Sequence, residues 1–196
     1  WMFPFAANVA ELQVYQILIE ACQKFNYVPA WNGNDFVDRE ITSLFDTKGS
    51  LDLVVCTDFK GFDQHYGEDM QNGSFASLDA LFTSTPEFRY WLESIFPIKY
   101  DIPLCVKWGL FTTGRHGMAS GSGGTNADET LGHSCLQREA ALEAGATLNP
   151  HSMCLGDDGI LSFPGISVES VLRTYTQHGL VMNPSKQFAS TEECVY

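Results

Sequence analysis

Residues 151–163 read HSMCLGDDGILSF, and this stretch constrains the fold more strongly than any other part of the chain. Asp158-Gly159 between two apolar runs indicates a β-hairpin, because this dipeptide adopts the tight turn that joins antiparallel strands. We therefore expect strands at roughly 148–155 and 160–163, with both acids at the tip. Asp157 stands beside Asp158, where the two charges repel each other. The turn requires only one of them, so turn geometry does not explain the pair.

The rest of the chain alternates helical periodicity with short apolar runs. The run LDLVVCTDF at 51–59 is rich in β-branched residues, which predicts a buried strand. More strand is expected at 102–111, with a turn near Trp108-Gly109, and a last short strand near Lys186. From apolar spacing, helices are expected over about 8–22, 37–45, 74–82, 87–96, 125–145 and 167–178.

Two of these helices carry capping-box pairs at their predicted starts, Asn8 with Glu11 and Thr125 with Asp128. The order of elements suits an α+β fold in which helices pack on one face of a small, mainly antiparallel sheet. A length of 196 residues favours one domain, or one domain with an appendage.

Composition narrows the class of protein. The six cysteines are dispersed singly with no zinc-ligand spacing, which is typical of buried thiols in a reducing compartment. The apolar runs are too short to span a membrane, and no secretory signal is visible. A net charge of −13 is the opposite of the footprint of a nucleic-acid-binding protein. An acidic enzyme fits this balance easily.

Three aspartates are candidates for a metal site. Asp58 ends the predicted strand at 51–58, and Asp157 and Asp158 lie at the hairpin tip. If the two strands are neighbours, three carboxylates converge at one end of the sheet, where their repulsion requires protonation or a cation. Such oxygen ligands suit Mg²⁺ or Mn²⁺, and two such ions can promote a phosphoryl transfer. Taken alone, a Gly-Asp-Asp-Gly turn is more often a solvated hairpin tip.

Three segments in order carry a family resemblance. CTDFKGFDQH (56–65) resembles motif A, ASGSGGTNADET (119–130) motif B and CLGDDGI (154–160) motif C of the viral RNA-dependent RNA polymerases. With WMFPFAANVAEL near the start, the chain looks most similar to picobirnavirus-like and partitivirus-like enzymes. The resemblance extends from residue 1 to about 190.

The resemblance implies a polymerase palm, with a small antiparallel sheet packed on helices, a ferredoxin-like core and partial fingers. Residues 1–50 correspond to partial fingers before the palm, and 51–196 to the palm with motifs A to D, with a finger insertion near 64–118. The implied reaction is RNA-directed RNA synthesis by two-metal nucleotidyl transfer. The implied metal ligands are Asp58, Asp157 and Asp158.

Other site residues follow from the same motifs. Asp63 is expected to sense the ribose 2′-hydroxyl of the incoming nucleotide, with Asn126 joining it. The loop that meets nucleotide and template is expected to be shaped by Ser120, Gly121 and Thr125. Many such polymerases carry asparagine four residues after the threonine, whereas this chain has Glu129 there. In the place of motif D, Lys186 is the candidate proton donor to the leaving pyrophosphate, with an ordinary strand-end lysine as the alternative.

The expected partners are an RNA template, nascent RNA and nucleoside triphosphates, with possible capsid association, in the host cytoplasm or inside the viral particle. We expect a basic segment before Trp1 and a thumb after Tyr196, and we expect this segment to be inactive by itself. Two alternatives stay open. A reverse-transcriptase-like palm is disfavoured by Asp63, because those enzymes usually place a bulky aromatic residue there. A non-catalytic acidic interaction domain predicts no metal dependence.

Overall fold

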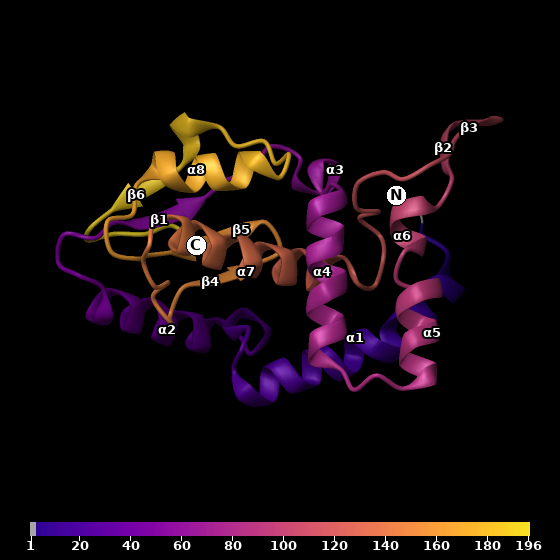
Figure 1. Ribbon diagram of the computed structural model, residues 1–196, viewed down its shortest axis with the longest axis horizontal. Helices are drawn as coiled ribbons and strands as arrows, with labels where there is room; N and C mark the ends of the chain where they lie inside the picture. The colour runs from indigo at the N-terminus through magenta and orange to yellow at the C-terminus, as the bar shows by residue number, and fades with distance from the viewer. Residues whose placement is uncertain (1–2) are drawn as a thin grey trace.

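The computed structural model describes residues 3–196, in which helices are combined with two small antiparallel sheets (Figure 1). The larger sheet has the strand order β4-β5-β1-β6, and each neighbouring pair is antiparallel. Its strands are β4 (Met153–Leu155), β5 (Asp158–Leu161), β1 (Val54–Thr57) and β6 (Phe188–Ser190). The predicted hairpin, buried strand and last strand are therefore confirmed, but the predicted turn at Asp158-Gly159 is wrong. Leu155 pairs with Asp158, so Gly156 and Asp157 form the two-residue turn, and Asp158 and Gly159 already belong to β5. Gly156, with a φ of 59°, supplies the left-handed backbone that this turn needs.

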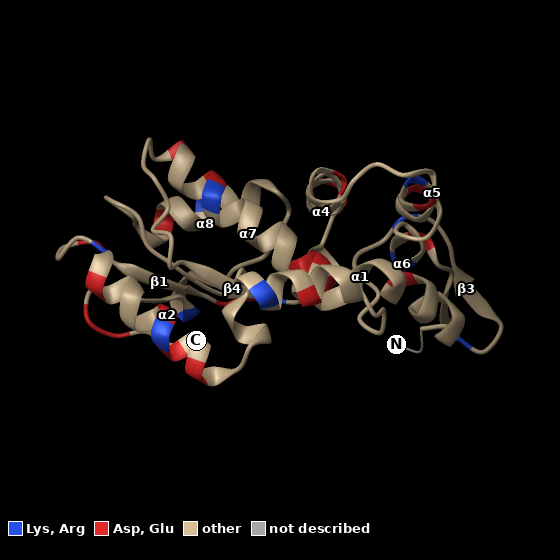
Figure 2. Cartoon of the chain, turned by 90° about the horizontal axis from the view of Figure 1, so that it is seen from below, with Lys and Arg blue, Asp and Glu red and all other residues tan. Residues whose placement is uncertain are grey.

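Helices cover both faces of this sheet, so the prediction of a single covered face is wrong. Successive side chains of a strand point to opposite faces, and all four residues of β1 are buried. On one face Val54 and Cys56 pack with Leu44 of α2 (Asn34–Thr47). On the other, Val55 belongs to the core that includes α7 (Thr125–Glu143) and α8 (Val168–Gln177). Figure 2 shows α2 on one side of the strands and α7 and α8 on the other.

The part of the molecule beside the sheet is helical. Its main helices are α1 (Phe5–Phe25), α4 (Glu68–Leu81) and α5 (Pro86–Ser94), with the short helices α3 (Phe62–His65) and α6 (Ile98–Asp101). Aromatic rings fill the space between these helices; the ring centroids of Tyr15 and Trp91, for example, lie 5.3 Å apart. Two short 3₁₀ helices, η1 (Pro29–Trp31) and η2 (Pro184–Lys186), complete the elements.

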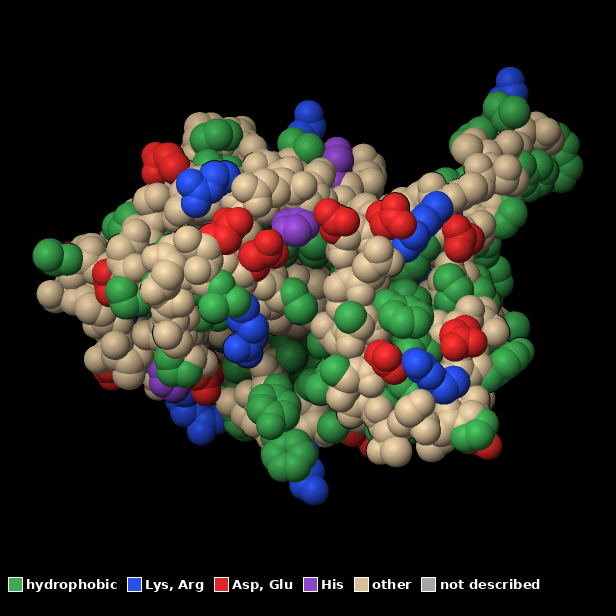
Figure 3. All heavy atoms as spheres, viewed as in Figure 1, with side chains coloured by type: hydrophobic (Ala, Val, Ile, Leu, Met, Phe, Trp, Pro, Cys, Tyr) green, Lys and Arg blue, Asp and Glu red, His purple; other side chains and the backbone are tan. Residues whose placement is uncertain are grey.

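A small hairpin projects from this helical part. Strands β2 (Leu104–Lys107) and β3 (Leu110–Thr112) pair with each other, and Gly109 has a positive φ of 76° in the predicted turn. Figure 3 shows the hairpin standing clear of the body. Trp108 at its tip is 98% exposed. No helix among residues 3–196 combines the length and the apolar character that crossing a bilayer requires.

Helix ends follow local chemistry in some places and long-range contacts in others. Ser167 begins α8 with a capping box to Ser170, and α7 ends just before Gly145, whose φ is 65°. Both predicted capping boxes are wrong, because α1 begins at Phe5 and the N-cap of α7 is Gly124. The acids of those two pairs, Glu11 and Asp128, are instead fully buried and bonded to distant residues.

Candidate active site

The antiparallel pairing of β1 with β5 brings the three candidate carboxylates to one end of the sheet. Thr57 lies opposite Gly159, so Asp58 follows β1 beside the end of the hairpin, where Asp157 lies in the turn and Asp158 begins β5. Burial raises the pKa of Asp158, and the negative charges of Asp157 and Asp58 raise it further. The three side chains are solvent-exposed and repel one another. Within residues 3–196, no three acidic, histidine or cysteine side chains are gathered closely enough to hold one metal ion as they stand.

Asp58 is held through its backbone by a residue next to Lys186. The Asp58 N–H donates to the Gln187 side-chain oxygen at 3.0 Å, and the Gln187 amide donates to the Asp58 carbonyl at 2.7 Å. This clamp brings η2 to the acidic end of the sheet. The Lys186 Nζ consequently lies 3.9 Å from the Asp58 Oδ2, with both side chains largely exposed.

Asp63 lies in α3 and contacts two residues of the glycine-rich motif. The Ser120 hydroxyl donates to the Asp63 carboxylate, and the Glu129 carboxyl shares a hydrogen bond with it. Burial raises the pKa of Glu129 to about 10, aided by the hydrogen bond with Asp63 and by nearby negative charge. Glu129 is therefore a neutral carboxylic acid at pH 7, and a neutral acid can donate where a carboxylate cannot.

Asn126 is also near the acidic turn, but its side chain bonds to Trp31 and not to Asp63. Its side-chain oxygen accepts from the Trp31 indole N–H at 2.8 Å. A Cβ built on Gly156 would lie 3.4 Å from the Asn126 amide nitrogen and 3.5 Å from a Glu129 oxygen. The two side chains therefore flank the same point of the turn, with Glu129 as the one bonded to Asp63.

The glycine-rich loop is tied to α1. The Gly123 N–H donates to the Asn8 side chain at 2.6 Å, and the Asn8 amide donates to the Gly121 carbonyl at 3.2 Å. Ser122 donates to Glu11 at 2.6 Å, and Thr125 donates to the Ala119 carbonyl at 3.2 Å. The loop that carries Ser120 and Gly121 is therefore held in place from a helix more than a hundred residues earlier in the sequence.

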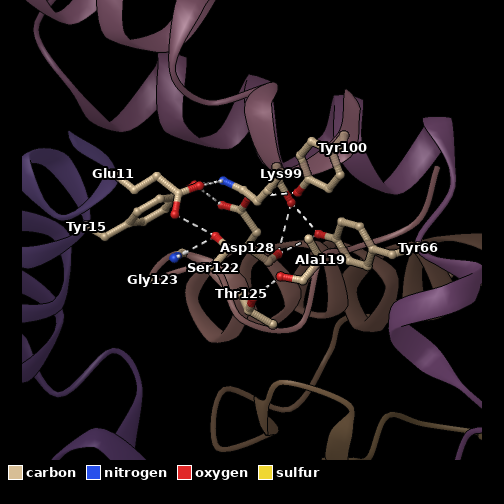
Figure 4. A network of polar contacts seen from close by, with 12 residues as sticks. Glu11, Tyr15, Tyr66, Lys99, Tyr100, Ala119, Ser122, Gly123, Thr125 and Asp128 are labelled. Carbon is tan, nitrogen blue, oxygen red and sulfur yellow. Dashed lines mark hydrogen bonds and ion pairs between the residues drawn. The ribbon is translucent and has the colours of Figure 1, made fainter. Parts of the chain in front are cut away.

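Behind the loop lies a buried polar network (Figure 4). The Lys99 Nζ lies 3.0 Å from the Asp128 Oδ2 and 3.3 Å from the Glu11 Oε1, and all three side chains are completely buried. The hydroxyls of Tyr15 and Tyr100 donate to Asp128 at 2.6 and 2.7 Å. One cation thus lies between two anions, and hydroxyl donors offset the remaining charge, as buried ions require.

Comparisons with known proteins agree with this geometry. No protein-family model matches the chain. Over all 196 residues the chain is 56% identical to a "Potential RNA-dependent RNA polymerase" of Human picobirnavirus (strain Human/Thailand/Hy005102/-). The crystal structure of the RNA-dependent RNA polymerase of a human picobirnavirus matches the whole chain with a TM-score of 0.97 and 56% identity. The chain is a homologue of the picobirnavirus RNA-dependent RNA polymerases.

The match covers a part of the longer polymerases. The chain spans 36% of the length of the curated relative and 37% of that crystal structure. A crystal structure of the insertion loop deletion mutant of a human picobirnavirus polymerase also matches the whole chain, with a TM-score of 0.96 and 56% identity, over 38% of its own length. The resemblance drawn from motifs A to C is thereby confirmed, and so is a mixed fold of helices and a small antiparallel sheet.

Several residues of this polymerase homologue escaped the sequence analysis because their partners are remote. Gln187 follows Lys186 and bears no motif, and Lys99 lies in a four-residue helix. His133 bonds to the Gly156 carbonyl beneath the acidic turn. Its spacing of four residues from Glu129 and eight from Thr125, on a helix that begins within motif B, is the one sequence signal that could have indicated it.

Proposed function

We propose that the chain is the catalytic core of an RNA-directed RNA polymerase, with β1, β4, β5 and β6 as the sheet of a palm whose core is ferredoxin-like. The observation that supports this most directly is the position of Asp58 beside Asp157 and Asp158, in a chain 56% identical to a picobirnavirus polymerase. The reaction is attack of an RNA 3′-hydroxyl on the α-phosphate of a nucleoside triphosphate, directed by an RNA template, with release of pyrophosphate.

The donor set at this end of the sheet fits Mg²⁺ or Mn²⁺. Three exposed carboxylates supply hard oxygen ligands. The pKa of Asp158 is raised first by burial and then by the negative charges of Asp157 and Asp58, and a divalent cation relieves the second effect. We assign Asp58, Asp157 and Asp158 as the ligands. When bound, such ions stabilise the negative charge that develops on the reacting phosphate oxygens.

The nucleotide is recognised by the segment around Asp63. An Asp63 carboxylate accepts a hydrogen bond from a ribose 2′-hydroxyl, which a deoxyribose cannot give. Ser120 and Glu129 orient that carboxylate, since both contact it. Gly121 and Thr125 shape the loop, and Asn126 flanks the turn close enough to contribute to ribose binding.

Lys186 is the proposed general acid. An ammonium group near the triphosphate transfers a proton to the leaving pyrophosphate oxygen and so lowers the barrier to departure. Its position 3.9 Å from Asp58 supports this role, because the proposed leaving group lies against the same ligands.

The remaining assignments concern the larger assembly. We divide the chain into a fingers part at 1–50 and a palm at 51–196, with a finger insertion near 64–118. A charge of −13 leaves this segment without the positive surface that grips RNA, so we expect it to be inactive alone. In the virus we expect it to act on template and nascent RNA in the host cytoplasm or inside the particle, with possible capsid association.

The proposal is tested with the longest natural form of the polymerase. It should incorporate ribonucleotides on an RNA template with Mg²⁺ or Mn²⁺, and Asp157→Asn or Asp58→Asn should abolish incorporation and weaken Mn²⁺ binding. Asp79→Asn, which removes an exposed carboxylate paired with Arg89, is the matched control. A preference for deoxynucleotides would instead favour the reverse-transcriptase alternative. A flat Mn²⁺ titration together with no synthesis would favour the acidic interaction domain.

A further inference from the structure

One face of α7 contacts the backbone of the hairpin that carries the acidic pair. Thr130, His133 and Gln137 are three and four residues apart, so they lie on one side of the helix. The Thr130 hydroxyl accepts from the Gly156 N–H at 2.9 Å. The His133 Nδ1 lies 3.0 Å from the Gly156 carbonyl, and the Gln137 amide donates to the Met153 carbonyl at 2.9 Å.

His133 is a polar ring in apolar surroundings. It is completely buried, and the rings of Phe59, Phe62 and Tyr175 lie 5.4 to 6.0 Å from it, centroid to centroid. Its Nε2 is buried with no hydrogen-bond partner among the described residues. Burying an unsatisfied polar atom costs stability, and a phenylalanine fills a similar space without that cost. What the imidazole adds is the bond from Nδ1 to Gly156.

The direction of that bond is fixed by chemistry. A carbonyl oxygen only accepts, so the Nδ1 carries the proton and donates to Gly156. Burial lowers the pKa of His133 to about 4, against the opposing effect of the Gly156 bond, so the ring is neutral at pH 7. The ring is therefore a fixed donor across the working pH range of most enzymes.

His133 contacts the turn on both sides of the acids. Gly156, before the pair, has a φ of 59° and both of its backbone polar groups are bonded to α7. Gly159, after the pair, lies so close that an added Cβ would be 2.5 Å from the His133 Cε1. Asp157 and Asp158 are thus bracketed by two glycines that rest against one imidazole ring.

We propose that His133 is a positioning residue that holds the Asp157–Asp158 turn, through its bond to Gly156, in the geometry that a divalent cation needs. The inference rests on the proposed function. The negative charges of Asp157 and Asp58 oppose that of Asp158, so a restraint on the hairpin backbone is needed to keep these carboxylates together. Thr130 supplies the second restraint by accepting the Gly156 N–H.

The test distinguishes the effect of the aromatic ring of His133 from the effect of its hydrogen-bond donor. His133→Phe keeps an aromatic ring and loses the donor, whereas His133→Asn loses the ring but places an amide N–H where the Nδ1–H lay. Gln137→Met, which removes hairpin bonds remote from the turn, is the matched control. Each variant of the longest natural polymerase is measured for its unfolding temperature in EDTA, its Mn²⁺ dissociation constant, and the Mg²⁺ concentration that gives half-maximal synthesis.

We expect the His133→Phe variant to need at least about tenfold more divalent ion, as loss of a partner behind a metal ligand typically does, at an unfolding temperature close to that of the wild type. His133→Asn should unfold at a lower temperature yet keep a metal requirement within about threefold of the wild type, since its donor is retained. Gln137→Met should leave the metal requirement unchanged.

If His133→Phe binds Mn²⁺ as the wild type does, or if His133→Asn weakens binding equally, His133 has no positioning role. Should His133→Phe fail to fold, Thr130→Val tests the second restraint on Gly156, because it removes the acceptor for the Gly156 N–H while keeping the side-chain shape. An unchanged Mn²⁺ dissociation constant in Thr130→Val would then contradict a positioning role for this face of α7. A wild type that neither binds Mn²⁺ nor synthesises RNA contradicts the proposed function itself, and this inference with it.

Discussion

Burial raises the pKa of Glu129 to about 10, helped by its hydrogen bond with Asp63 and by the negative charges of Asp63, Asp157 and Asp128, so it keeps its proton at neutral pH. The asparagine that the family resemblance leads one to expect at this position is a hydrogen-bond donor. A protonated glutamate supplies a donor too, so the departure from the motif changes the residue type and preserves the chemistry toward Asp63. The buried position disfavours the ionised form of Glu129.

A first prediction concerns sugar selectivity. In the complete polymerase, Glu129→Gln keeps a donor toward Asp63, and the ratio of kcat/KM for a ribonucleotide over its 2′-deoxy counterpart should stay within about threefold of the wild type. Glu129→Ala leaves Asp63 without that donor, and the ratio should fall by about tenfold, the equivalent of about one hydrogen bond. Glu139→Gln, on the same helix but paired with His178, is the control. Equal selectivity in Glu129→Ala and the wild type would show that Glu129 does not orient Asp63.

A second prediction follows from the raised pKa of Glu129. The folded chain keeps this proton up to about pH 10, whereas the unfolded chain loses it above its ordinary pKa of 4.5. Between these values the folded state binds one more proton, so the free energy of unfolding falls as pH rises, by at most about 1.4 kcal/mol per pH unit. Urea unfolding of the wild type should therefore show a steeper loss of stability from pH 6 to pH 8 than unfolding of Glu129→Gln. Parallel slopes would mean that Glu129 is ionised in the folded protein.

At the scale of elements, the glycine-rich loop owes its position to charges buried behind it. Lys99, in the short helix α6, bridges Glu11 of α1 and Asp128 of α7 (Figure 4). Gly124 completes the arrangement, because an added Cβ there would lie 2.2 Å from the Tyr15 ring. Three elements and the loop therefore meet around a single ammonium group.

A third prediction is that Lys99→Met destabilises the fold by roughly 3–5 kcal/mol, because it leaves two buried carboxylates without their cation. Arg89→Met is the control, since the Arg89–Asp79 pair is about 40% exposed and its loss should cost about 1 kcal/mol or less. Chemical denaturation of both variants measures the difference. Similar losses for the two would mean that the network contributes no more than a surface pair.

The sequence predicted elements well where periodicity and turn chemistry are local. The hairpin, β1, α7 and α8 follow from turn residues between two apolar runs, from a β-branched run and from apolar spacing, all of which act between near neighbours. The turn itself falls on Gly156-Asp157, two residues before the predicted Asp158-Gly159. It predicted the meeting of Asp58 with the acidic turn, because strand ends and family motifs both imply it. It failed where a residue's partner is remote. Asp128 has the spacing of a cap, yet Lys99 and two tyrosines bind it instead. Likewise, nothing local indicates that α2 covers the second face of the sheet.

At the scale of the whole molecule, charge is the dominant property. Acidic residues outnumber basic ones by 24 to 11, and Figure 2 shows acids distributed over both halves. The projecting β2–β3 hairpin carries a basic residue instead, Lys107, beside an exposed Trp108. The polymerase active site proposed above, placed on so acidic a surface, would depend on basic groups elsewhere to retain RNA.

A fourth prediction is that the 196-residue segment, expressed alone, binds single-stranded RNA no more tightly than about 10⁻⁴ M at physiological salt, the weak end of non-specific binding. Fluorescence anisotropy with a labelled oligonucleotide measures this. The complete polymerase should bind the same oligonucleotide far more tightly and with a steeper salt dependence. Micromolar binding by the segment would contradict the inference drawn from its charge.

Helix α7 is anchored at two points that lie close together along its axis. Asp128 is anchored in the network behind the nucleotide loop, and His133 is anchored to the acidic turn. At 1.5 Å per residue these anchors are only about 8 Å apart along the helix axis, too short a span for a regular helix to bend. Glu129, which bonds to the proposed ribose sensor Asp63, and His133, which bonds to the hairpin of the proposed metal ligands, therefore lie on the same stiff segment of α7. If the proposed function holds, the ribose-recognition residues and the metal ligands keep a constant separation, and any movement on nucleotide binding belongs to other segments.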